Sequence, residues 1–190
     1  MTKAPDTIEM VPLLPIIEKY AEKATVAIDI GVCKATGSTR YIIKGMKKNP
    51  AKNKIFIGID HKDQREDWFK LEPWQHYVLG DSRKQSTVDK VKEILKFIKT
   101  KDKEVVAHFS ADLIFIDTVH EYEFLKQELA LWKQLAHPKT IWLFHDTWMF
   151  DIYNHMTDAI KEFAEESGIW EYVDITKESH GLGMLRPIIK

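Results

Sequence analysis

The stretch from residue 112 to residue 146 constrains the fold of this chain more than any other. It opens with the apolar run Leu113–Ile116, which ends at Asp117. It closes with the apolar run Ile141–Phe144, which ends at His145 and Asp146. Between the two runs, apolar residues recur at helical spacing, at Leu125, Leu129, Trp132 and Ala136. This order predicts a strand, a helix and a second strand joined as a right-handed crossover between parallel strands.

The carboxyl ends of these two predicted strands should meet at one edge of the sheet. Because neighbouring parallel strands run in the same direction, Asp117 is expected to lie beside the pair His145 and Asp146. Ligands of open α/β sheets bind outside the carboxyl ends of the strands. The segment therefore predicts that three polar side chains able to bind a metal gather at one place.

The rest of the chain alternates strand and helix patterns in the same way. Further strands are predicted at Thr25–Ile30, Ile55–Ile59, Gln75–Leu79, Trp170–Ile175 and Leu182–Ile189. Helices are predicted at Leu13–Lys23, at Ser38–Lys48, over residues 88–98 and over residues 152–163. This alternation is typical of a doubly wound α/β sheet. Only Thr176–Gly181 separates the last two strands, and so short a connection predicts an antiparallel pair.

Composition narrows the class of protein. The 190 residues, of which 44% are hydrophobic, suffice for one domain, expected at residues 25–190 after an arm and helix at 1–24. The formal net charge of −1 predicts neither a nucleic-acid nor a membrane partner. No apolar run approaches the roughly 20 residues of a membrane span. Because Cys33 is the single cysteine, we expect no disulfide and a cytoplasmic location.

The turn after the first predicted strand holds residues that suit an anionic or nucleoside ligand. Gly31 lets the backbone bend or approach a ligand, and the helix that starts near Gly37 and Ser38 offers free N–H groups. An ordinary strand-to-helix turn is the alternative. Two further strands end at Asp60 and at Gly80-Asp81-Ser82, which favours a nucleoside site. The pattern GxGxxG is missing, which disfavours a dinucleotide.

Six segments carry a resemblance to class I S-adenosylmethionine-dependent methyltransferases. They are AIDIGVCKATGST, IFIGID, YVLGDS, DLIFIDTVHEYE, WLFHDT and HGLGMLR, and the likeness runs from about Thr25 to the C-terminus. Within that family the chain resembles small-molecule O-methyltransferases related to macrocin O-methyltransferase and to cephalosporin hydroxylase-like proteins. The resemblance implies a Rossmann-like seven-stranded sheet, mostly parallel with the last strand antiparallel, and with helices on both faces.

The resemblance also implies a set of cofactor contacts. Asp29 and Gly31 would line the methionine part of S-adenosyl-L-methionine, and Asp60 would bind its ribose. Asp81 and Ser82 would flank the adenine. The predicted set is completed by Gly37, Ser38 and Asp117. One position departs from the family pattern, because Ala35 stands where the family usually has a glycine, and Gly37 follows two residues later.

A metal site is implied by the metal-dependent relatives, in which acids at the ends of the fourth and fifth strands hold Mg²⁺. Those positions fall on Asp117, His145 and Asp146 in this chain. Relatives often have two consecutive acids where this chain has His145 and Asp146. Since histidine is a poorer ligand than carboxylate for a hard cation, the alternatives to Mg²⁺ are Mn²⁺, Fe²⁺, Zn²⁺ or no metal.

Methyl transfer to a hydroxyl of a small molecule or sugar requires that the acceptor be oriented and lose its proton. His120 and His145 are the candidate general bases, because histidine titrates near neutral pH. For each, a structural hydrogen bond is the alternative. Trp148, Met149 and Phe150 are candidates for the wall of an acceptor pocket, unless they pack against Trp142.

Two other functions stay open at this point. One is a non-catalytic nucleotide-binding or scaffold protein that keeps a methyltransferase-like fold, because a fold does not determine a function. The other is a Rossmann-like oxidoreductase, which the missing GxGxxG disfavours. The residues do not identify the methyl acceptor, and they leave a homo-oligomer open.

Overall fold

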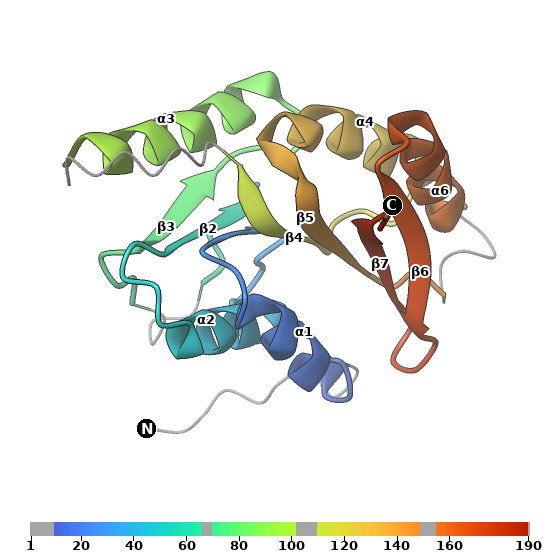
Figure 1. Ribbon diagram of the computed structural model, residues 1–190, viewed down its shortest axis with the longest axis horizontal. Helices are drawn as coiled ribbons and strands as arrows, with labels where there is room; N and C mark the ends of the chain where they lie inside the picture. Colours follow the sequence, from blue (N-terminus) through green and yellow to red (C-terminus); the bar gives the residue numbers. More distant parts are fainter. Residues whose placement is uncertain (1–9, 66–69, 102–109, 149–154, 190) are drawn as a thin grey trace.

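One seven-stranded sheet organises the described part of the chain, residues 10–65, 70–101, 110–148 and 155–189, in the computed structural model (Figure 1). The strand order is β3-β2-β1-β4-β5-β7-β6. The strands are β1 (Val26–Ile30), β2 (Ile55–Asp60), β3 (Gln75–Leu79), β4 (Ala111–Ile116), β5 (Ala136–His145), β6 (Trp170–Thr176) and β7 (Leu182–Pro187). The first five pair in parallel, and β7 runs antiparallel to both of its neighbours. The predicted doubly wound sheet is confirmed.

Helices cover both faces of the sheet. In Figure 1, α1 (Leu14–Ala21) and α2 (Ser38–Lys48) lie on one face. The other face carries α3 (Gln85–Lys101), α4 (Tyr122–Trp132) and α6 (Met156–Ser167). Because both faces are covered, β1 and β2 are buried along their whole length. Alternate residues enter two separate cores: Ile28 belongs to the core under α3, α4 and α6, and Ala27 to the core under α1 and α2.

The first helix is packed into the main fold. Gly45 of α2 lies so close to α1 that a Cβ atom would stand 2.3 Å from the carbonyl oxygen of Glu18. Lys44 and Lys48 of α2 also form ion pairs with the buried carboxylate of Glu18. The described part of the predicted arm and helix at 1–24 therefore shares a core with the sheet, and residues 1–9 lie outside the described ranges.

The predicted boundary between the central helix and the strand that follows it is wrong. Ala136, which the helical pattern included, is the first residue of β5, and α4 ends at Trp132 before the short 3₁₀ turn Lys133–Leu135. Pro138 opposes a longer helix, because a proline disfavours helical backbone at the residue before it, here His137. Residues 152–154, the start of another predicted helix, lie outside the described ranges, and α6 begins at Met156.

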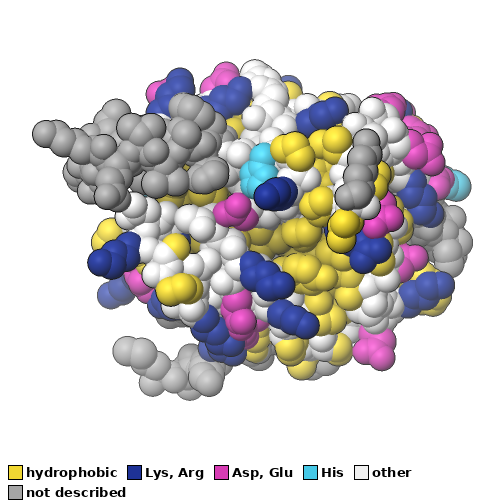
Figure 2. All heavy atoms as spheres, viewed as in Figure 1, with side chains coloured by type: hydrophobic (Ala, Val, Ile, Leu, Met, Phe, Trp, Pro, Cys, Tyr) yellow, Lys and Arg dark blue, Asp and Glu magenta, His cyan; other side chains and the backbone are white. Residues whose placement is uncertain are grey.

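Charged side chains of both signs are mixed on the face shown in Figure 2. Lys and Arg are scattered there among acidic and apolar side chains, and apolar side chains gather over β5 and β7. Among the described helices, none has both the length and the apolar composition to cross a bilayer.

Candidate functional site

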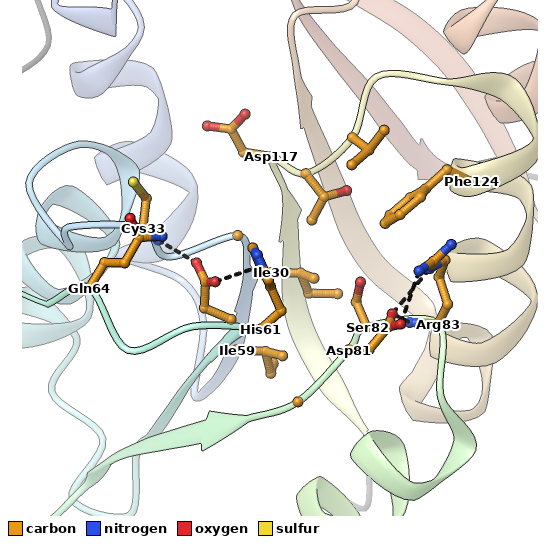
Figure 3. A pocket seen from close by; sticks show the side chains of 15 residues that line it. Ile30, Cys33, Ile59, His61, Gln64, Asp81, Ser82, Arg83, Asp117 and Phe124 are labelled. Carbon is orange, nitrogen blue, oxygen red and sulfur yellow. Dashed lines mark hydrogen bonds and ion pairs between the residues drawn. The ribbon is translucent and has the colours of Figure 1, made fainter.

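A cavity of about 470 Å³ lies at the carboxyl edge of the sheet, where β1, β2, β3 and β4 end (Figure 3). It is lined by five of the predicted cofactor-binding residues: Gly31, Asp60, Asp81, Ser82 and Asp117. The other three, Asp29, Gly37 and Ser38, are not among the described residues that line it. In Figure 3, Cys33 and Gln64 stand at one end of the cavity, and Ser82, Arg83 and Phe124 at the other. The topology thus brings together turns that are distant in the sequence.

Asp60 connects two of the turns at this edge. Its Oδ2 atom accepts a hydrogen bond of 2.7 Å from the backbone N–H of Cys33, and its Oδ1 atom accepts one of 3.0 Å from the N–H of Lys62. Nδ1 of His61 lies 3.0 Å from the same Oδ1. Since Asp60 is buried at the end of β2, these contacts hold its carboxylate in one orientation at the cavity wall.

Asp29 lies beneath the first turn and is fully buried. Its Oδ2 atom accepts a hydrogen bond of 2.5 Å from the hydroxyl of Thr39, and Oδ1 has no hydrogen-bond partner among the described residues. Burial raises the pKa of Asp29 to about 7, despite the hydrogen bond from Thr39. Gly37 is the N-cap residue of α2, and Ser38 is buried in its first turn. These three predicted contacts therefore do not line the cavity.

Gly31 allows the end of β1 to pack against the end of β4. Its φ angle is +97°, and a Cβ atom there would stand 1.9 Å from the carbonyl oxygen of Asp117. The glycine is thus required by backbone packing as well as by the bend that the sequence predicted. Ala35, at the position where the family usually has glycine, has φ +62°. The turn keeps a left-handed conformation there without the glycine that normally favours it.

The end of the cavity near Ser82 is held in place by side chains of α4. Arg83 donates hydrogen bonds of 3.1 and 3.0 Å to the carboxylate of Asp81, and its guanidinium lies 4.3 Å from the ring centre of Phe124. The hydroxyl of Ser82 donates to the buried carboxylate of Glu128. Sequence reasoning missed Glu128, although an available signal was its place beside Leu125 on the apolar face of the helix.

The two predicted acids at the ends of β4 and β5 meet as expected. Nε2 of His120 lies 2.9 Å from Oδ2 of Asp146 and 3.5 Å from Oδ1 of Asp117. Nδ1 of His145 lies 3.3 Å from Oδ1 of Asp117 and 3.2 Å from Oδ2 of Asp146. We call these residues, together with His180, the acid–histidine cluster. His180 stands 3.3 Å from Oδ1 of Asp146 and was not predicted.

Each carboxylate in the acid–histidine cluster shifts the titration of its neighbours. Burial alone would raise the pKa of Asp117 and Asp146, but hydrogen bonds from His120 and His145 bring both below their ordinary values. Burial would lower the pKa of the two histidines, yet bonding to the carboxylates raises it to about 9 for His120 and about 10 for His145. At neutral pH the two carboxylates therefore face two imidazolium ions.

The same atoms form a donor set of the size that a metal ion requires. One ligand atom each of Asp117, His120 and Asp146 lies within 4.8 Å of the others. Two carboxylates and one imidazole suit a divalent cation. The structure thus places His120, predicted only as a base, where it would be a ligand. His145, predicted as a ligand, contacts the same two carboxylates through Nδ1.

The predicted wall of the acceptor pocket is described only at Trp148, since Met149 and Phe150 lie outside the described ranges. Trp148 is 49% exposed. Trp142, its alternative packing partner, is fully buried and packs against Phe163 and Trp170. The exposed ring of Trp148 is therefore accessible to a ligand.

Comparison with solved structures reveals the same fold in several methyltransferases. The SAH-bound methyltransferase PaMTH1 of Podospora anserina has a TM-score of 0.62 at 12% identity, over 98% of this chain and 81% of that protein. An O-methyltransferase of Bacillus cereus in complex with SAH has a TM-score of 0.60 at 12% identity, over 98% and 84%. MycE of the mycinamycin pathway, solved with Mg, SAH and mycinamycin VI, has a TM-score of 0.58 at 12% identity. The match covers 93% of this chain but only 48% of MycE. At these identities the likeness establishes the fold alone.

No curated protein sequence matches this chain significantly. A family profile does match, from Asp29 at the end region of β1 to Thr147 just after β5. The matched segment includes the cavity residues Gly31, Asp60 and Asp117 and covers more than half of the chain. The chain therefore belongs to the methyltransferase domain family.

Proposed function

We propose that the protein transfers a methyl group from S-adenosyl-L-methionine to a hydroxyl group of a small molecule or sugar. The observation that carries this proposal is the position of Asp117. It lines the cavity and also contacts the two histidines of the acid–histidine cluster. A cofactor in the cavity and an acceptor at the cluster would therefore adjoin, as an in-line displacement requires.

The cavity suits an S-adenosyl nucleoside in its dimensions and in its polar groups. A volume of about 470 Å³ is within the range of small-molecule sites. Asp60 would accept hydrogen bonds from the ribose, and Asp81 with Ser82 would flank the adenine. Asp29, Gly31, Gly37 and Ser38 would form the methionine end and the turn behind it. The SAH bound to PaMTH1 and to the Bacillus cereus enzyme supports this choice of cofactor.

A divalent cation is proposed at Asp117, His120 and Asp146, with His145 as a further ligand or as the residue that orients the two acids. The Mg in the MycE structure supports a metal in this fold. The nitrogen donors of this chain, however, favour Mn²⁺, Fe²⁺ or Zn²⁺ over Mg²⁺. When bound, the cation would lower the pKa of the acceptor hydroxyl and orient it.

His120 and His145 remain the proposed general bases, His120 only in a site without metal, because a ring nitrogen bound to a cation cannot accept a proton. Because Asp117 and Asp146 keep both imidazoles protonated at neutral pH, neither can accept a proton while these carboxylates carry their full charge. Once that charge is neutralised by another group, the histidine pKa falls toward its ordinary value and proton transfer becomes feasible. Proton removal is thus expected to depend on how the acid–histidine cluster is occupied.

Calorimetric titration with S-adenosylhomocysteine tests the cofactor. We expect binding by the intact protein, loss of binding in Asp60→Ala, and unchanged binding in Asp89→Ala, an exposed acid on α3. No binding at millimolar ligand would refute the proposal. Preference for nicotinamide nucleotides would favour an oxidoreductase instead. For catalysis, Asp146→Ala should abolish turnover while S-adenosylhomocysteine still binds, because Asp146 does not line the cavity. Full activity without metal would refute the metal site.

We also propose that the protein can form a homo-oligomer. The apolar side chains that gather over β5 and β7 in Figure 2 support it. Light scattering during size-exclusion chromatography gives the mass directly, and a mass of 22.2 kDa at all concentrations would contradict the proposal.

A further inference from the structure

Glu128 is a fully buried acid on α4 whose carboxylate contacts two hydroxyl groups of the cavity wall. One oxygen, Oε1, accepts a hydrogen bond from the hydroxyl of Ser82, and the other, Oε2, accepts one of 2.7 Å from the hydroxyl of Thr118. Both hydroxyl residues line the cavity, and Glu128 stands behind them. A buried carboxylate is costly unless it is hydrogen-bonded, so its place here calls for a role.

The loop that carries Ser82 is held rigidly from two helices. Nε1 of Trp132, one turn after Glu128 on α4, donates a hydrogen bond of 3.0 Å to the carbonyl oxygen of Ser82. From α3, the hydroxyl of Thr87 donates one of 2.7 Å to the carbonyl oxygen of Asp81. The side chain of Asp81 already accepts hydrogen bonds from Arg83. At this end of the cavity, the hydroxyl oxygens of Ser82 and Thr118 are therefore well-placed groups for a ligand.

The direction of these hydrogen bonds limits what the ligand can be. A hydroxyl group has one proton to donate and two lone pairs to accept with. Because Ser82 and Thr118 each direct their proton at ionised Glu128, both oxygens can only accept from the cavity side. A purine that places position 6 beside these oxygens would donate to them through a 6-amino group, whereas a 6-oxo purine would turn another acceptor toward them.

We propose that Glu128 is a positioning residue that fixes Ser82 and Thr118 as acceptors, so that the cavity selects a 6-amino purine nucleoside over a 6-oxo one. This inference rests on the proposed function, because it takes an S-adenosyl nucleoside as the ligand. Glu128 does not line the cavity and acts only through the two hydroxyls.

The inference requires an ionised Glu128, which decides the pH of the test. Burial raises the pKa of Glu128 to about 7, hydrogen bonds from Ser82 and Thr118 lower it, and the charges of Arg83 and Asp81 act in opposite directions. At pH 8 the carboxylate is mostly ionised, and both hydroxyl protons are then committed to it.

Calorimetry at pH 8 with S-adenosylhomocysteine and its 6-oxo analogue, S-inosylhomocysteine, measures the selection directly. We expect the intact protein to bind the analogue about tenfold to a hundredfold more weakly, the usual effect of facing two buried acceptors. Equal affinities would overturn the inference and leave the proposed function standing. If neither nucleoside bound, the proposed function would fall, and this inference with it.

The variant Glu128→Gln separates positioning from a structural role. A carboxamide accepts from one hydroxyl but donates to the other, whose own proton is then free to point into the cavity. The ratio of the two affinities should therefore fall toward one, with an absolute gain for S-inosylhomocysteine. A merely structural role would weaken both ligands equally and leave the ratio unchanged, which would overturn the inference.

Two more variants keep the test decisive if Glu128→Gln fails to fold. Thr118→Val preserves the shape of the side chain and removes one acceptor, so the ratio should also fall. An unchanged ratio in Thr118→Val would count against the inference. Glu123→Gln, the same exchange at an exposed position of α4, is the matched control and should keep the ratio of the intact protein.

Discussion

Nδ1 of His180, in the turn between β6 and β7, lies 3.3 Å from Oδ1 of Asp146, just past the end of β5. A backbone hydrogen bond joins the same two segments, since the N–H of Trp148 donates one of 2.9 Å to the carbonyl oxygen of His180. Asp146 and His180 both adopt positive φ angles, of 60° and 70°. The final antiparallel hairpin thus adds an imidazole to carboxylates that come from the parallel part of the sheet.

The first prediction concerns this contact. His180→Ala should weaken binding of Mn²⁺ by about tenfold or more, because groups that orient a ligand carboxylate usually contribute that much to metal affinity. Calorimetric titration of the protein with Mn²⁺ gives the affinity. Binding of S-adenosylhomocysteine should be unchanged. His155→Ala is the control, since His155 is exposed and pairs with Asp158 away from the acid–histidine cluster. Equal Mn²⁺ affinity in both variants would contradict the prediction.

A second prediction concerns the contact between β1 and β4. Gly31→Ala should destabilise the protein by at least about 3 kcal/mol, because the new Cβ atom meets the Asp117 carbonyl and φ is positive. Gly168→Ala is the matched control: φ is +63°, but no described atom lies within 4 Å of the added Cβ. That variant should lose only about 1 kcal/mol. Urea unfolding measures both, and similar losses would show that the close approach is unimportant.

Much of the site could be predicted because its acids directly follow apolar runs. Asp60, Asp117 and Asp146 each end a strand that is recognisable by composition, and parallel topology alone brings such ends together. Glu128 and His180 were missed for different physical reasons. The former stands out as an acid on an otherwise apolar helix face, but its two hydroxyl partners lie in other segments of the sequence. The latter lies in a turn whose place depends on the antiparallel pairing of β5 with β7, which no local pattern specifies.

The third prediction concerns the choice of metal. Because imidazole nitrogens favour later transition metals over Mg²⁺, Zn²⁺ should bind at least about tenfold more tightly than Mg²⁺. His145→Asp restores two consecutive acids before Thr147 and should narrow this difference by strengthening Mg²⁺ binding. Competition titrations followed by calorimetry provide the ratio. A ratio that stays the same in His145→Asp would mean that this side chain does not influence the metal.

The last prediction concerns the pH dependence of stability in the metal-free protein. Burial raises the pKa of Asp29 from 3.8, and that of Glu128 from 4.5, to about 7. The pKa of His120 rises from 6.5 to about 9, because its hydrogen bonds to two carboxylates outweigh the effect of burial, which lowers it. In each case the folded state keeps a proton that the unfolded chain has released. The free energy of unfolding therefore falls as the pH rises from the ordinary pKa to the shifted one, which is from 3.8 or 4.5 to about 7 for the two acids and from 6.5 to about 9 for His120. The melting temperature should therefore be lower at pH 8.5 than at pH 5.

The variant Asp29→Asn measures how much of this fall in melting temperature comes from Asp29. Asparagine has nearly the same shape, can still accept the hydrogen bond from Thr39, and does not titrate. The melting temperature of the variant should therefore fall less between pH 5 and pH 8.5 than that of the intact protein. The difference between the two falls should be roughly 5 °C or more, since one kcal/mol corresponds to about 2–4 °C at this chain length. Asp89→Asn, on the surface of α3, should keep the full fall. The same dependence in both variants would show that Asp29 releases its proton on the folded protein at an ordinary pH.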